Sequence, residues 1–139
     1  MRECVFCEIG SGHAETNLVY QDNLVFAIMS LEQPTPYKVI VIPYAHVETV
    51  YDLTDEQAAA IFQATVKLAR AIRDVSGCEG MNLVQSNGRA GQQDVFHFHL
   101  HIVPRFVGDQ IILNWDNTPA PAEKLSQFAS EIRSKLKES

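Results

Sequence analysis

Short apolar runs separated by turn-forming residues dominate the first third of the chain. They have the length and the β-branched content of strands. The predicted strands are Leu18–Tyr20, Leu24–Met29 and Val39–Pro43. Asp22 and Asn23 separate the first two as a tight hairpin turn, and Pro34 and Pro36 interrupt the chain before the third. We therefore expect an antiparallel meander of three strands.

A helical repeat follows the meander. Thr54 has the character of an N-cap, Gln57 completes a capping box three residues later, and Gly77 is well placed to end the helix. Between them, apolar side chains recur at intervals of three and four. These positions are Ala58, Ile61, Phe62, Thr65, Leu68, Ala69, Ile72 and Val75. The pattern predicts one long amphipathic helix.

Two further strands and a second helix complete the pattern. The strands are expected at 81–86 and 95–104, with a glycine-bearing loop at 87–92 between them. Behind Pro119 and Pro121, apolar residues at helical spacing predict a C-terminal amphipathic helix. They are Leu125, Phe128, Ala129, Ile132 and Leu136. The sum is an α+β fold with a five-stranded antiparallel sheet, in which 1–139 form one domain and 119–139 its C-terminal extension and helix.

Composition narrows the possible partners. The 139 residues are 46% apolar and 20% charged, the balance of a globular chain. Eleven Lys and Arg against seventeen Asp and Glu give a net charge of −6, and cations cluster only at Arg133, Lys135 and Lys137. Duplex nucleic acid is therefore an unlikely partner by charge. No signal-like segment and no run of about eighteen apolar residues is present, which predicts a cytoplasmic protein without a membrane partner.

Three histidines alternate with apolar residues near residue 100. In a strand, His97, His99 and His101 share one face, roughly 6.5–7 Å apart. The apolar residues Phe96, Phe98, Leu100 and Ile102 then share the face that packs on the long helix. Two interpretations stay open: a catalytic zinc held by the His-x-His pattern, or an imidazole that attacks an electrophile while its neighbours orient it.

Cys4 and Cys7 form a C-x-x-C pair near the N-terminus. A redox pair usually opens a helix within a βαβ unit, and no such unit is predicted here. With His46 and one histidine of the triad strand, the pair would instead complete a closed Cys₂His₂ set, which is typical of structural zinc. Cys78 is expected to be a core thiol, and His13 has no assigned role.

The spacing of these residues resembles the histidine triad (HIT) nucleotide-binding family. The triad segment from His97 to Val103 has the pattern His-φ-His-φ-His-φ-φ, where φ is apolar. The likeness extends to Cys4-x-Phe6-Cys7-x-Ile9, Val41-Ile42-Pro43-x-x-His46, Asn87-Gly88 and Gln93-x-Val95-Phe96, and Arg105 after Pro104 is similar to bacterial members.

The resemblance implies a homodimer of α+β protomers that binds a small-molecule nucleotide and attacks its α-phosphate. His99 inherits the role of nucleophile, His101 contacts the phosphate, and Gln93 and Asn87 lie near the phosphate or the leaving group. A structural zinc would be held by Cys4, Cys7, His46 and His97.

The implied activity is hydrolysis of a nucleoside phosphoramidate or related nucleotide through a covalent nucleotidyl-histidine. The alternatives within the family are a dinucleoside polyphosphate hydrolase and a nucleotidyltransferase. Outside that mechanism, a zinc-dependent hydrolase and a non-catalytic nucleotide-binding module stay open. By position, the base pocket is expected to be formed by Phe6, Ile9, Ile28 and Leu31.

Four positions depart from the family pattern. Ser30 stands where many members have an Asp that holds the ribose hydroxyls, and Asp94 stands where some have a Ser or Thr beside the phosphate. Tyr37-Lys38 replaces a common Gly-His. The nucleotide preference is therefore open, and an acidic chain has to attract an anionic ligand through local groups.

Overall fold

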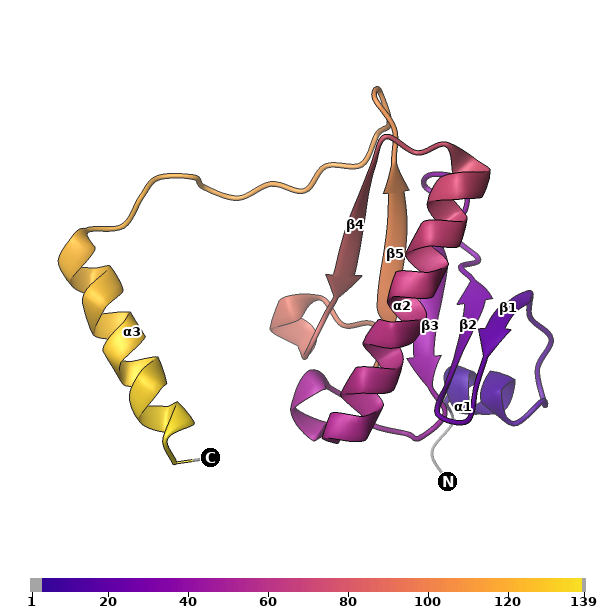
Figure 1. Cartoon of the computed structure of the whole chain (residues 1–139), viewed down its shortest axis with the longest axis horizontal. Helices are drawn as coiled ribbons and strands as arrows, with labels where there is room; N and C mark the ends of the chain where they lie inside the picture. The colour runs from indigo at the N-terminus through magenta and orange to yellow at the C-terminus, as the bar shows by residue number, and fades with distance from the viewer. Residues whose placement is uncertain (1–3, 139) are drawn as a thin grey trace.

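The computed structural model describes residues 4–138, which form three α-helices, two 3₁₀ turns and five strands (Figure 1). In chain order these are α1 (Val5–Gly10), β1 (Leu18–Gln21), β2 (Val25–Met29), β3 (Val39–Pro43), η1 (Val50–Asp52), α2 (Asp55–Ser76), β4 (Gly80–Gln85), η2 (Arg89–Gly91), β5 (Leu100–Arg105) and α3 (Ala122–Leu136).

The five strands form one antiparallel sheet in the order β1-β2-β3-β5-β4. The predicted meander of the first three strands is confirmed, and so is the turn at Asp22, whose carboxylate accepts the backbone N–H groups of Leu24 and Val25. The fold is thus the α+β arrangement that the sequence predicted.

Strand β5 is shorter than predicted, because residues 95–99 do not pair with the sheet. Leu100 is the first residue of β5 to pair with β3 and with β4. At the edge of this gap, the Pro43 carbonyl accepts a hydrogen bond from the His97 ring, and Phe98 N–H donates to Val47 O. The prediction that all three triad histidines lie within a strand is therefore wrong: only His101 does.

Helix α2 covers one face of the sheet, and its ends are those that the sequence predicted. Thr54 and Gln57 form the capping box, and Gly77 ends the helix at φ +67°, a conformation that glycine adopts without strain. Its buried face packs on apolar side chains of β2, β3 and β5. Three residues of the predicted apolar repeat, Ala58, Phe62 and Val75, are exposed, because only a narrow stripe of the helix faces the sheet.

Helix α1 lies against the opposite face and was not predicted, since six residues are too few for a helical repeat. Phe6 is its one buried residue, and it joins an apolar cluster with Phe26, Ile28, Ile40 and Ile42. The sheet therefore separates two apolar cores, one under each helix.

The C-terminal helix stands apart from the sheet and from the other helices (Figure 1). An irregular segment joins α3 to β5. Arg105 holds the start of this segment, because it donates to both carboxylate oxygens of Asp109 and to Ile111 O. Four of the five predicted apolar residues of α3 are exposed, Ile132 to 62%, and Ala129 is partly buried. None of the helices in the described part of the chain is long and apolar enough to span a membrane.

Candidate functional site

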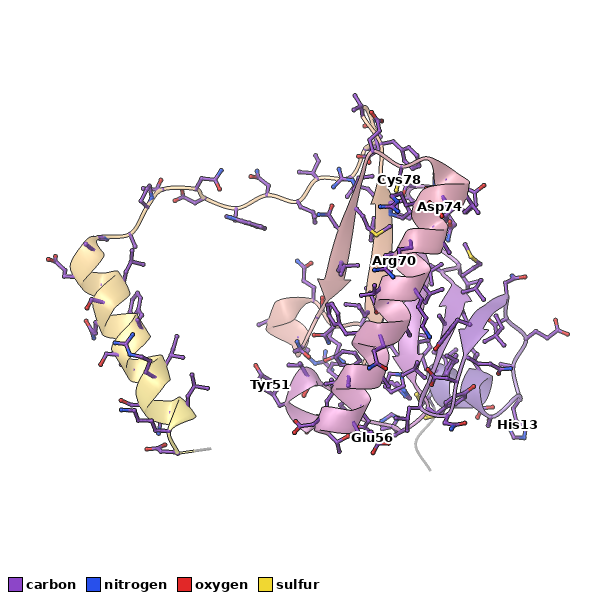
Figure 2. The ribbon with its side chains drawn as sticks, in the orientation of Figure 1. His13, Tyr51, Glu56, Arg70, Asp74 and Cys78 are labelled. Atoms are coloured by element: carbon purple, nitrogen blue, oxygen red, sulfur yellow. The ribbon has the colours of Figure 1, made fainter. Side chains whose placement is uncertain are left out.

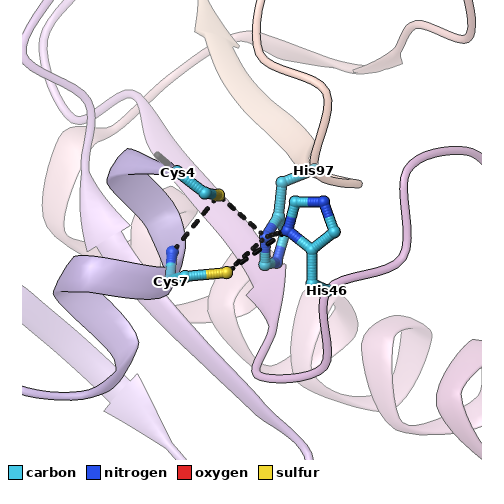
Figure 3. A group of neighbouring side chains, drawn as sticks. All are labelled: Cys4, Cys7, His46 and His97. Carbon is cyan, nitrogen blue, oxygen red and sulfur yellow. Dashed lines mark hydrogen bonds between the residues drawn. The ribbon is translucent and has the colours of Figure 1, made fainter. Parts of the chain in front are cut away.

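Two cysteines and two histidines from three separate segments converge beside α1 (Figure 3). Cys4 and Cys7 come from the start of α1, His46 follows β3, and His97 precedes β5. Their ligand atoms all lie within 4.8 Å of one another. Across residues 4–138, this is the one cluster of three or more potential metal ligands.

The distances within this Cys₂His₂ cluster suit one tetrahedral zinc ion. Cys4 Sγ lies 3.3 Å from His97 Nδ1, Cys7 Sγ lies 3.3 Å from His46 Nδ1, and the two Nδ1 atoms are 3.2 Å apart. Zinc bonds of about 2.0 Å to nitrogen and 2.3 Å to sulfur give tetrahedral edges of about 3.3–3.8 Å. The cluster can therefore hold the metal that the sequence predicted, with the predicted four ligands.

The hydrogen bonds of His97 favour metal binding. Its Nε2 lies 2.8 Å from Pro43 O, and because a carbonyl only accepts, Nε2 carries the hydrogen. The bare Nδ1 lone pair then faces the two sulfurs. Burial lowers the pKa of His97, which keeps the ring neutral, as a ligand must be. The alternative zinc held by all three triad histidines does not fit, because the His97 lone pair points at the cysteines.

His99 is held with its second nitrogen available for chemistry. Its Nδ1 donates to His97 O over 2.7 Å, so the lone pair of the neutral ring is on Nε2. The ring is buried, with the edge of Phe6 against it and the His101 ring centroid 5.0 Å away. Asp94 Oδ1 lies 3.6 Å from His99 Nε2. The arrangement presents an oriented imidazole nitrogen to the space beside Asp94.

His101 is neutral at pH 7. Burial and, to a smaller extent, the charges of Lys38 and His99 together lower its pKa to about 4, against an opposing effect of Asp94. Its buried Nδ1 has no hydrogen-bond partner among the described residues.

A cleft of about 290 Å³ opens in front of His99 and His101. Most of the residues predicted to bind a nucleotide line it. They are Phe6, Ile9, Ile28, Ser30, Leu31, Asp94, His99 and His101. Ile28 is buried, whereas Leu31 is fully exposed and stands at the rim. The cleft therefore has an apolar part and a polar part, as small-molecule sites commonly do.

Asn87 and Gln93, also predicted near the ligand, are not part of the described wall of this cleft. Gln93 is buried and accepts from Gly88 N–H, while its amide donates to Glu48 O and Val95 O. Asn87 accepts from Val50 N–H and exchanges hydrogen bonds with Gln85. In this structure both side chains organise the loop between β4 and β5.

Lys38 also lines the cleft, although its place in the sequence did not predict a role for it. The feature of the sequence that could have pointed to Lys38 is the replacement of the common Gly-His by Tyr37-Lys38. Tyr37 adopts φ +72°, a left-handed conformation in which glycine is unstrained, and this explains why glycine is common at the position. Lys38 supplies a positive charge beside His101 in an acidic chain.

His13 and Cys78 lie outside both groups of residues. Figure 2 shows His13 on the loop after α1, where its Nδ1 contacts Ser11 Oγ, and Cys78 beyond the C-terminal end of α2. Cys78 is only partly buried, so the prediction that it is a core thiol is confirmed only in part.

A model of the HIT domain matches residues 11–108 of the chain. The chain belongs to the HIT family. Protein hit of Bacillus subtilis is 40% identical over 139 residues, which covers 96% of this chain and 94% of that protein. An adenosine 5′-monophosphoramidase of Schizosaccharomyces pombe is 30% identical over 96% of this chain and 98% of its own length. An adenylylsulfatase of Arabidopsis thaliana is 30% identical over 74% of this chain and 52% of its own.

Solved HIT structures carry the same fold. A crystal structure from Streptococcus mutans UA159 matches 98% of this chain and 87% of its own, with a TM-score of 0.93 and 33% identity. A zinc-bound histidine triad protein of Mycobacterium smegmatis matches 83% of this chain and 84% of its own, with a TM-score of 0.74 and 34% identity. HIT relatives of this chain therefore include nucleotide hydrolases and a zinc-bound protein.

Proposed function

We propose that this HIT protein hydrolyses a nucleoside phosphoramidate or related nucleotide by attack of His99 on the α-phosphate. The observation that carries the proposal is the hydrogen bond from His99 Nδ1 to His97 O, which leaves the Nε2 lone pair beside Asp94 at the cleft. A neutral imidazole nitrogen held in this way is an activated nucleophile. The phosphoramidase among its relatives supports the choice of substrate.

The reaction takes two displacements. The His99 Nε2 lone pair forms a bond to phosphorus while the P–N bond of the substrate breaks, and the amine leaves with that electron pair and takes up a proton. Water then attacks the same phosphorus, the P–Nε2 bond breaks, and the water gives up a proton. The products are the nucleoside monophosphate and the free amine, and His99 regains its lone pair.

The cleft residues orient the nucleotide. His101 can donate a hydrogen bond to a phosphate oxygen, and Lys38 adds a positive charge beside it. Ser30 replaces a carboxylate as the ribose contact, and the apolar wall of Phe6, Ile9 and Ile28 receives the base, with Leu31 at its rim. Gln93 and Asn87 act on the phosphate region by holding its loop rather than by contact.

The zinc in this proposal is structural. When bound, it would join α1 to the segment before β5 through the Cys₂His₂ cluster. His97 has two functions in this arrangement, because its ring faces the cluster and its carbonyl orients the nucleophile. The cytoplasmic location predicted from the sequence stays a prediction.

We also propose that the protein is a homodimer. Three turns of α3 expose apolar side chains, half or more of each accessible, and no part of its own sheet covers them (Figure 1). The Streptococcus mutans structure, which matches 98% of this chain, supports the position of α3. Sedimentation should give a dimer for the native chain and a monomer for Phe128→Glu. A dimer of unchanged stability in that variant would exclude α3 from the interface.

The nucleophile is tested by His99→Ala, with His13→Ala as the matched control on an exposed loop. We expect the His99 variant to lose about a thousandfold or more in kcat on adenosine 5′-phosphoramidate, and the His13 variant to keep it. Quenched reactions of the native chain should contain protein that carries one nucleotidyl group. Unchanged hydrolysis in the His99 variant would overturn the proposal.

A further inference from the structure

The two HIT relatives named as enzymes act on adenylyl compounds whose leaving groups differ in charge. One is a monophosphoramidase, which releases a nitrogen group, and the other is an adenylylsulfatase, which releases the sulfate anion. The residue beside the nucleophile of this chain is a carboxylate. Its charge bears directly on which leaving group the cleft accepts.

The charges of the cleft are ordered along the triad. His101 pairs with Ile40 across the sheet, and Val39 pairs with Ile102, so Lys38 lies at the His101 end of the row. Asp94 lies at the other end, 3.6 Å from His99 Nε2. The cation and the anion therefore stand on opposite sides of the two rings, with the cation beside the group expected to contact the phosphate.

Asp94 also lies on the open side of the cleft, beside the proposed nucleophile. His99 is buried, with 6% of its side chain exposed, so it forms the wall of the cleft, whereas 82% of the Asp94 side chain is exposed. Attack from the wall drives the leaving group away from phosphorus toward the open side, because attacking and leaving atoms are roughly in line. The bond from Val95 N–H to Asp94 Oδ1, 2.8 Å long, holds the carboxylate in place.

We propose that Asp94 selects substrates by the charge of the leaving group, so that this protein favours nucleoside phosphoramidates of cationic amines over nucleotides with anionic leaving groups. The inference rests on the proposed attack by His99. Asp94 attracts an ammonium group at the open side and repels sulfate or phosphate there, while Lys38 at the far end offsets its repulsion of the α-phosphate.

The test uses two adenosine 5′-phosphoramidates of equal length, one made with 1,3-diaminopropane and the other with 3-aminopropanol. The first carries an ammonium group on its tail, and the second a neutral hydroxyl. For the native chain we expect kcat/KM to favour the ammonium compound by roughly fivefold, because the carboxylate is close but partly screened by water. High salt should reduce this ratio.

Asp94→Asn keeps the oxygen that accepts from Val95 and removes the charge, so the ratio should fall to about one and cleavage of adenylyl sulfate should rise. Glu56→Gln, at the exposed start of α2 (Figure 2), makes the same change in net charge and should keep the native ratio. Asp94→Ser provides a second variant if the Asn variant unfolds, as judged by thermal unfolding.

An Asp94→Asn variant that keeps the native ratio overturns the inference, and so does one in which both substrates slow equally. Failure of the proposed function looks different, because the native chain would then cleave neither compound. In that case the dissociation constants of the two compounds still give the ratio, and equal constants for the native chain would overturn the role of Asp94 independently.

Discussion

The two faces of the sheet are covered in different ways. On one face, the 22-residue helix α2 buries an apolar stripe. This helix begins at a complete capping box and ends at a glycine cap. On the other, six residues of α1 bury one phenylalanine, and the N-cap is Cys4, whose sulfur also belongs to the Cys₂His₂ cluster. Helix α2 is stable through its own length and packing, whereas α1 is too short to persist without attachment to the rest of the fold.

This difference explains why the cleft and its histidines lie on the face under α1. The face covered by the long helix is filled mainly by apolar side chains, among them Phe98, Leu100 and Ile102. The face under α1 is covered only in part, and it keeps room for His99, His101 and a cleft. Stability and function are therefore divided between the two sides of one sheet.

The largest effect is expected at the cluster. Cys7→Ser should lose the metal, release α1 and lower the free energy of unfolding by about 3–5 kcal/mol, a fraction of the binding free energy of structural zinc. Metal analysis and urea unfolding measure both changes. Cys78→Ser removes the one other described cysteine, which lies outside the cluster, and should keep the metal. Retained metal and native stability in Cys7→Ser would show that α1 does not depend on the cluster.

A smaller effect is expected under α2. Ile61 is 2% exposed, and Ile61→Ala should cost about 2–4 kcal/mol through lost burial and the cavity left behind. The exposed Val75→Ala control should change stability by about 0.5 kcal/mol or less. Metal content should stay native in both variants. Loss of metal from Ile61→Ala would mean that the two faces are coupled.

The smallest effect is a pH dependence of stability that arises from His101, on the polar face of the sheet. Unfolded His101 takes a proton below a pKa of about 6.5, but folded His101 only below about 4, so acid favours the unfolded chain across that window. We expect His101 to lower the free energy of unfolding by about 2 kcal/mol at pH 4, after a discount for its partial exposure. His101→Gln should flatten the fall in unfolding free energy between pH 6.5 and 4. An equally steep fall in that variant would exclude His101 as its source.

Features that depend on local sequence signals could be predicted, whereas features that depend on distant contacts could not. The ends of α2 were predicted correctly, because a capping box, a glycine and a helical repeat are all local signals. Residue type and spacing predicted a Cys₂His₂ set of Cys4, Cys7, His46 and one triad histidine, and the resemblance to the HIT family identified that histidine as His97. Helix α1, the bend at residues 95–99 and the role of Lys38 were missed, because each depends on contacts between segments far apart in the chain.

The sequence by itself determined the meander and the capped helix, since periodicity and residue type carry that information, and its resemblance to the HIT family singled out His97 as the fourth candidate metal ligand. Only the tertiary structure decided how the three histidines differ. His97 turns its ring to the cysteines and its carbonyl to His99, while His101 alone joins the paired strand. Alternation along a strand treats the three as equivalent, and only their distant partners, Pro43 and the two cysteines, make them unequal.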